Sequence, residues 1–177
     1  MITSPRDIKY DPHLDPERVG AIGVARYAVE FFAAGEAADD AIGSEYLDVA
    51  PTSVTFLMGR SLELALKAFL IHKEIPLDFL KRDVGHNLER ALTRAESAGL
   101  SSIVTLTDQD RSIIIMLNAS YSKKDLEYFI RGAATYPLYR PLQSVCKRVL
   151  EAIINEIPDA RILLRSRAGR IFESVQT

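Results

Sequence analysis

Apolar residues recur along this chain with the spacing of α-helices, and prolines separate the apolar stretches. Prolines occur at positions 5, 12, 16, 51, 76, 137, 141 and 158, mostly between these stretches rather than within them. Proline interrupts the interior of a helix, so this placement marks where helices end. No stretch has the alternation and the hairpin partner of a paired strand. The pattern therefore predicts an all-α fold, an up-and-down bundle of about five helices.

Capping residues predict where several helices begin. Asp15 followed by Pro16 predicts that the first helix starts there and runs to about position 35 or 43. Thr107, with Asp110 three residues later, resembles a capping box and predicts the start of the fourth helix. The third helix is expected between a Gly-His-Asn segment at 85–87 and Gly99. The last is expected over 141–156.

The segment from Pro51 to Glu74 is apolar almost all round. Arg60, Glu63, Lys67 and Glu74 fall in one narrow stripe when residues are placed at helical angles. Such a helix belongs at the centre of a bundle, and Glu63 and Lys67, four residues apart, are expected to pair. The stripe has two interpretations: an ion-pair network that fixes helix register, or a polar pocket for a ligand or an RNA phosphate. Glu63 and Lys67 are therefore candidate binding residues.

Length and composition indicate one globular domain. The chain has 177 residues, 47% of them hydrophobic, and its 22 basic and 24 acidic residues give a net charge of −2. This balance provides no overall field that would attract nucleic acid or anionic membrane. No apolar run approaches the ~20 residues of a membrane span, and the N-terminus lacks the apolar core of a secretory signal. We expect a cytoplasmic protein without membrane contact. It should have a domain over 1–157 and a basic C-terminal tail over 158–177 that is solvated, exchanged with a partner or in contact with RNA.

The residues suggest little metal or thiol chemistry. The single cysteine, Cys146, has apolar neighbours and is expected to be a small buried side chain. The three histidines, His13, His72 and His86, are isolated from one another and lack the spacing of a metal-binding pair. No glycine-rich phosphate loop follows a strand pattern. We expect neither a metal nor a cofactor.

His86 and Asn87 stand where the third helix should begin. One interpretation is that either side chain caps this helix and packs it against the second helix. The other is that His86 is a general base, with Arg82 as a nearby cation. His86 and Arg82 are thus candidate catalytic residues, and Asn87 is a candidate binding residue.

Aromatic and basic residues alternate between positions 121 and 140. This composition suits stacking on unpaired bases, a dimer interface, or packing between helices. The aromatic residues are Tyr121, Tyr128, Phe129, Tyr136 and Tyr139, and the basic ones are Lys123, Lys124, Arg131 and Arg140. Arg131 is a further candidate binding residue.

Two segments, SLELALKAFLIHKEI and VGHNLERALTRAESAGL, resemble the HEPN superfamily. The resemblance consists of a long helix with Glu-x-x-x-Lys, followed by Gly-His-Asn-Leu at the start of a leucine-spaced helix. The later segment YSKKDLEYFIRGAATYPLYRPL resembles bacterial relatives, so the similarity extends from about Pro51 to Ile157. It implies a helical bundle that commonly forms homodimers. Many members of this superfamily are toxins or defence proteins that cleave RNA without a metal.

The resemblance implies a ribonuclease signature, in which an arginine and a histidine on a helix are separated by four to six residues. This sequence does not match that signature. Arg82 and His86 have three residues between them, and Arg6 and His13 fit the spacing only in a segment that Pro12 disfavours as helix. We therefore expect a binding or dimerisation module in a bacterial stress, toxin-antitoxin or defence context, with RNA, a nucleotide or a protein as possible partner. The alternative is a divergent metal-independent ribonuclease using His86 with Arg82, Lys67 or Arg131.

Overall fold

The computed structural model describes residues 15, 18–43, 50–127 and 135–165, and within them the regular structure is helical, without a strand. The longer helices are α1 (Ala21–Ile42), α2 (Thr52–His72), α4 (Leu88–Ser97), α5 (Asp108–Tyr121) and α6 (Tyr139–Glu156). The shorter elements are α3 (Leu77–Phe79), a π-helical turn η3 (Leu80–Val84), and two 3₁₀ segments, η4 (Leu100–Ser102) and η5 (Ala160–Arg165). The predicted all-α fold is confirmed, and the five longer helices correspond to the five that were expected.

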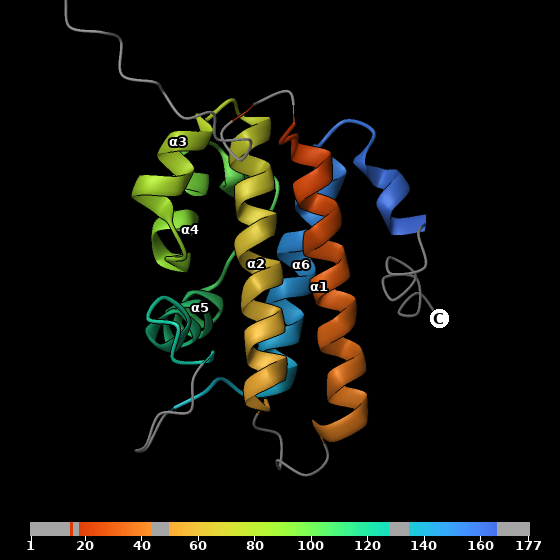
Figure 1. Ribbon diagram of the computed structural model, residues 1–177, viewed down its shortest axis with the longest axis vertical. Helices are drawn as coiled ribbons and strands as arrows, with labels where there is room; N and C mark the ends of the chain where they lie inside the picture. The colour runs from red at the N-terminus through yellow and green to blue at the C-terminus, as the bar shows by residue number, and fades with distance from the viewer. Residues whose placement is uncertain (1–14, 16–17, 44–49, 128–134, 166–177) are drawn as a thin grey trace, which may run out of the picture.

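Helix α2 lies at the centre of the fold. It runs antiparallel to α1 and alongside α6, while α4 and α5 lie on its other side (Figure 1). Helix α5 is seen nearly end-on in this view, so its axis crosses those of α1, α2 and α6. Thirteen of the 21 residues of α2 are buried, which explains why its sequence is apolar almost all round.

Small residues bring α1 and α2 close together. The hydroxyl of Ser61 on α2 donates to the main-chain carbonyl of Ala28 on α1 at 2.8 Å, and both residues are fully buried. Large side chains from α1 and α2, among them Phe32, Met58 and Phe69, fill the surrounding core and are 0% exposed. The polar hydroxyl is therefore satisfied inside an otherwise apolar interface.

The predicted start of the first helix is wrong. The carbonyl of Asp15 accepts the N–H groups of Arg18 and Val19 in a separate turn, and α1 begins only at Ala21. Gly20, which precedes it, has an extended backbone with φ −93° and ψ 156°. This extended conformation interrupts the helical backbone, so α1 starts after Gly20 and does not continue from the turn at Asp15. Its end at Ile42 matches the later of the two expected positions.

The end of helix α2 and the end of the folded domain also differ from the prediction. Helix α2 ends at His72, and Glu74 has a φ of 60°, which removes Glu74 from the charged stripe. Beyond position 157, where the domain was expected to end, Ala160 and Leu163 are 0% and 8% exposed and belong to the core. Segment η5 packs on α1 and α6 because these two apolar side chains cover them. Positions 166–177 of the expected tail lie outside the described residues.

Cys146 is buried as predicted, with 1% of its surface exposed on α6. Burial raises the pKa of its thiol to about 12, so the reactive thiolate is scarce at neutral pH. We expect a thiol reagent such as DTNB to modify the native protein far more slowly than the urea-unfolded protein at the same pH. Rapid stoichiometric modification of the folded chain, measured by absorbance, would contradict this burial.

Gly59 on α2 leaves room for the ring of Tyr121 on α5. A Cβ atom at Gly59 would lie 2.7 and 2.9 Å from two ring carbons of Tyr121, which is closer than such atoms approach. Gly23 on α1 has open space at the corresponding position, with no atom within 4 Å. These two helical glycines therefore differ in the room that a methyl group would find.

We expect Gly59→Ala to destabilise the protein by about 1–3 kcal/mol, because the ring must move and its contacts are lost. Gly23→Ala is the matched control and should be stabilising by about 0.5 kcal/mol, because only the helix propensity changes. Urea unfolding followed by circular dichroism measures both. Equal effects of the two substitutions would show that Tyr121 does not pack closely on Gly59.

Candidate functional site

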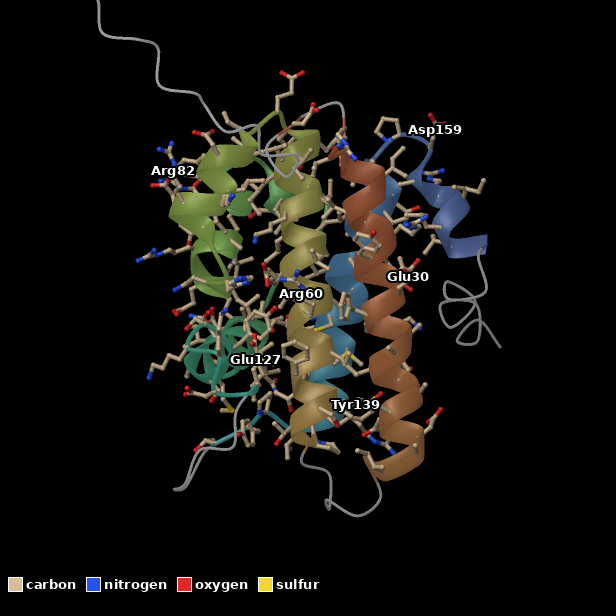
Figure 2. The ribbon with its side chains drawn as sticks, viewed as in Figure 1. Glu30, Arg60, Arg82, Glu127, Tyr139 and Asp159 are labelled. Atoms are coloured by element: carbon tan, nitrogen blue, oxygen red, sulfur yellow. The ribbon has the colours of Figure 1, made fainter. Side chains whose placement is uncertain are left out.

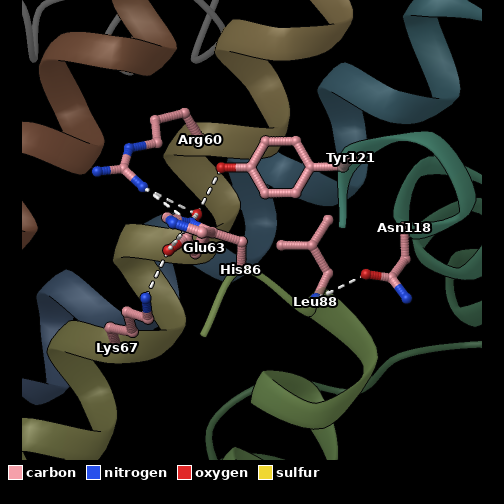
Figure 3. Close-up of polar contacts among 7 residues, drawn as sticks. All are labelled: Arg60, Glu63, Lys67, His86, Leu88, Asn118 and Tyr121. Carbon is pink, nitrogen blue, oxygen red and sulfur yellow. Dashed lines mark hydrogen bonds and ion pairs between the residues drawn. The ribbon is translucent and has the colours of Figure 1, made fainter. Parts of the chain in front are cut away.

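The carboxylate of Glu63 is completely buried and accepts hydrogen bonds from four side chains (Figure 3). Lys67 Nζ lies 2.5 Å from Oε1, Arg60 Nη1 lies 3.0 Å from Oε2, and the Tyr121 hydroxyl lies 2.5 Å from Oε2. His86 Nδ1 lies 3.1 Å from both oxygens. The predicted pairing of Glu63 with Lys67 is confirmed, and the stripe forms an ion-pair network rather than a row of solvated charges.

The charges in this network favour an ionised Glu63. Burial by itself raises the pKa of Glu63, but the charges of Lys67 and Arg60, with hydrogen bonds from Lys67 and Tyr121, outweigh it and hold that pKa below its ordinary value. Burial and the neighbouring carboxylate raise the pKa of Tyr121, so its hydroxyl keeps the proton that it donates. Burial lowers the pKa of Arg60, but the charge of Glu63 more than compensates and raises it. Because a carboxylate only accepts, His86 carries a proton on Nδ1 in this contact.

Three segments that are distant in sequence supply these donors. Arg60 and Lys67 come from α2, at three residues before and four residues after Glu63. His86 comes from the turn between η3 and α4, where Gly85 has a φ of 56° that favours glycine and lets the chain reverse. Tyr121 is the last residue of α5. The network therefore joins α2, α4 and α5.

The N-terminus of α4 has a second set of anchors. Asn87 Oδ1 accepts the N–H of Arg90 at 2.9 Å, so the predicted cap is confirmed for Asn87. The buried Asn118 of α5 accepts the N–H of Leu88 at 2.8 Å and donates from Nδ2 to Glu89 at 2.6 Å. These contacts fix the start of α4 against α5 and use backbone groups that could otherwise bind an anion.

Arg82 does not belong to this network. It was expected as a cation near His86, but it lies in the π-helical turn η3 and pairs with Asp78 at 2.6 Å. The two side chains are 74% and 50% exposed, and Figure 2 shows Arg82 at the outer edge of the molecule while Arg60 lies among the helices. Arg82 and Asp78 are four residues apart, so they lie on the same outer face, and their ion pair holds Arg82 on that face. Arg131 lies outside the described residues, as do Arg6 and His13.

Of the three interpretations of the aromatic and basic stretch, packing between helices holds for the two tyrosines at its ends. Tyr121 is 5% exposed and its hydroxyl is bound to Glu63, so its ring cannot stack on a base. The hydroxyl of Tyr139 donates to Glu36 Oε1 on α1 at 2.6 Å, which ties the start of α6 to α1. Tyr128 and Phe129 are outside the described residues.

The sequence reasoning missed the roles of Tyr121 and Asn118 in the network. Their partners, Glu63 and Leu88, are 58 and 30 positions away, beyond the reach of local periodicity. One signal was available, since Gly59 lies one helical turn before Glu63 on an otherwise bulky helix and marks a close approach by another side chain. No local pattern indicated Asn118.

The described residues contain neither a metal-binding cluster nor a membrane-spanning helix. No group of three or more His, Cys, Asp and Glu side chains there is arranged to hold a metal ion. The helices in the described ranges are also too short or too polar to cross a membrane. The network around Glu63 is the candidate site because it brings together Glu63, Lys67 and His86, three of the residues that the sequence singled out.

We expect Glu63→Gln to destabilise the protein by about 2–3 kcal/mol at neutral pH. This is less than the ~3–5 kcal/mol for breaking a wholly buried pair, because Arg60 and Lys67 are 31% and 18% exposed. The pKa of Glu63 is lower in the folded than in the unfolded chain. Its contribution is therefore present above the ordinary glutamate pKa of 4.5 and is lost as pH falls through the lower folded value.

Urea unfolding of both proteins across the acidic range measures this difference. The matched control is Glu30→Gln, because Glu30 pairs with Arg26 where both side chains are more than half exposed. That substitution should change the free energy of unfolding by less than about 0.5 kcal/mol at any pH. A Glu63→Gln effect that stays constant down to the lowest pH would argue against an ionised Glu63.

Comparisons with known proteins identify no relative of this chain. It matches no protein-family model, no curated protein and no solved structure.

Proposed function

We propose that this chain is a HEPN-like helical binding or dimerisation module that presents a rigid surface to a partner in a bacterial stress, toxin-antitoxin or defence context. The HEPN-like assignment rests on the helix with Glu63 and Lys67 and on the Gly-His-Asn-Leu segment at 85–88. The contact of His86 with Glu63 supports it, because the two motifs that carry the resemblance meet at one point in the fold.

The observation that carries the proposal is that the two partly buried cations, Arg60 and Lys67, are both bound to Glu63. Arg60 and Lys67 lie beside His86, where a ribonuclease needs a cation for the charge that develops on the phosphate. Here Arg60 binds one oxygen of Glu63 at 3.0 Å and Lys67 binds the other at 2.5 Å, so both cations are used to balance the charge of Glu63. Withdrawing either cation would leave a buried carboxylate poorly paired, which costs several kcal/mol. The network thus favours a role in holding helices over a role in catalysis.

One observation favours the alternative, a divergent metal-independent ribonuclease. The His86 side chain is 48% exposed while its Nδ1 is held by Glu63. A carboxylate that fixes the proton on Nδ1 leaves Nε2 as the acceptor, as a general base requires. Nε2 would take the proton of a ribose 2′-hydroxyl, whose oxygen attacks the adjacent phosphorus. A 2′,3′-cyclic phosphate would form and the 5′-oxygen would leave and be protonated.

Incubation of the purified protein with labelled single-stranded RNA separates these functions. We expect no cleavage above that of a buffer blank, with the products resolved by gel electrophoresis. RNA binding measured in the same samples at low and high salt reports phosphate contacts, since these weaken as salt rises.

The proposal is wrong if the wild type cleaves RNA and His86→Ala abolishes cleavage while circular dichroism shows an intact fold. His72→Ala is the matched control, because His72 is the other described histidine and lies at the far end of α2, near Glu156. Cleavage that survives both substitutions would not come from His86, and the alternative that rests on His86 would then be wrong.

A further inference from the structure

Two adjoining grooves lie where the short elements after α2 meet helix α4. The first, the apolar slot, has a volume of about 350 Å³ and is lined by Ile75, Pro76, Phe79, Ser97 and Ala98, with Arg94 at its edge. The second, the arginine groove, has a volume of about 760 Å³ and contains Arg82, Arg90 and Arg94 together with Asp83 and Glu89. Arg94 lines both, so a single ligand can occupy the two grooves at once.

The arginines of this groove are weakly held, unlike Arg60. Arg82 pairs with Asp78 in a solvent-exposed contact, which typically contributes only about 0–1 kcal/mol and exchanges readily. Arg90 Nη1 is 3.4 Å from the main-chain carbonyl of Asp83. The guanidinium carbon of Arg94 lies 5.0 Å from the centre of the Phe79 ring, which leaves its edge available for hydrogen bonds. These groups can therefore turn to an anionic partner at low cost.

The groove also contains two acidic residues, whose carboxylates would repel an anionic partner if they faced it. Glu89 Oε2 accepts a hydrogen bond from the side chain of Asn118 at 2.6 Å, which directs this carboxylate toward α5. Asp83 is exposed, and its carbonyl rather than its carboxylate is the group that contacts Arg90. Arg82 is already paired with Asp78, so Arg90 and Arg94 are the cations of the groove that remain to meet an anionic partner.

The lining of the apolar slot indicates which kind of group would lie beside the anionic part of a partner. Its lining is mostly apolar, and the hydroxyl of Ser97 already donates to the carbonyl of Thr93 at 2.9 Å. A nucleobase placed there would lose hydrogen bonds to water without replacing them, which is costly. An aliphatic or aromatic side chain has no such groups to satisfy and buries apolar surface.

We propose that the apolar slot and the arginine groove together bind a protein segment with one apolar anchor side chain flanked by acidic residues. This inference rests on the proposed binding function and names the chemistry of the partner. The anchor fills the slot beside Phe79, and the carboxylates pair with Arg90 and Arg94, in the arrangement of an apolar interface core with a charged rim. The hydrogen bonds that fix the start of α4 hold this surface in place, so the protein loses little conformational freedom on binding.

Selection from a displayed library of random peptides on the full-length protein tests this inference. We expect enrichment of peptides in which a Leu, Ile, Phe or Trp is flanked by Asp or Glu. Binding of a synthetic enriched peptide, measured by fluorescence anisotropy, should weaken at least about tenfold for Arg90→Glu/Arg94→Glu and for Ser97→Trp, which narrows the slot. Higher salt should weaken it as well, because the carboxylate contacts are near the surface.

Two substitutions outside the grooves serve as matched controls. Arg18→Glu/Arg26→Glu makes the same double charge reversal at exposed positions at the start of α1 and before it, and Ser101→Trp adds the same ring at an exposed position of η4. Neither should change the affinity more than about twofold. Thermal melting confirms that all four variants are folded.

The inference is overturned if no peptide is enriched, if the enriched peptides lack acidic residues, or if the groove variants bind as tightly as the controls do. In the last case peptides still bind, so the binding function stands and only this surface is wrong. The inference is also overturned if the groove variants weaken the binding of a 5′-phosphorylated oligonucleotide but not the binding of any peptide. Cleavage of RNA through His86 is a separate measurement and would instead overturn the proposed function.

Discussion

An ionised carboxylate that water does not reach must be surrounded by donors, and Glu63 is such a group at the centre of this fold. Its donors come from α2, from the turn before α4 and from the end of α5. Removing a carboxylate from water costs several kcal/mol, so the fold tolerates Glu63 only while these donors stay in place. The positions of α4 and α5 against α2 are therefore interdependent, because a shift of either leaves a charge unpaired.

Helix α4 shows this dependence most clearly. It has only ten residues, and an isolated helix of that length is marginal in water. Four of its residues, Leu88, Ala91, Leu92 and Ala95, are buried and supply its apolar contact with the bundle. Polar contacts hold both of its ends: His86 reaches Glu63, Asn87 caps the first turn and Asn118 accepts the N–H of Leu88 at the N-terminal end. Near the C-terminal end Glu96 pairs with Arg111 of α5. The helix is thus held as a rigid platform.

The arginines of the protein have two different roles according to their surroundings. Arg60 is partly buried and tied to Glu63, and its removal would leave that carboxylate poorly paired. Arg82, Arg90 and Arg94 lie along the exposed side of η3 and α4, where solvent screens their contacts. Charges of the first kind hold helices together, whereas those of the second kind can exchange partners. This difference is the physical basis for proposing a contact surface on the outside of α4 and a helix-holding role for the charged network on its inner side.

The sequence by itself determined the helices, their capping at Asn87 and Thr107, and the pairing of Glu63 with Lys67, because these depend on residues three or four positions apart. It could not determine the start of α1, where an extended Gly20 overrides the caps at Asp15, or the outward direction of Arg82 in a π-helical turn. Only the tertiary structure decided that Tyr121 and Asn118 complete the polar contacts. Their partners are brought to them by the packing of α5 across α2 and α4, which no local spacing encodes.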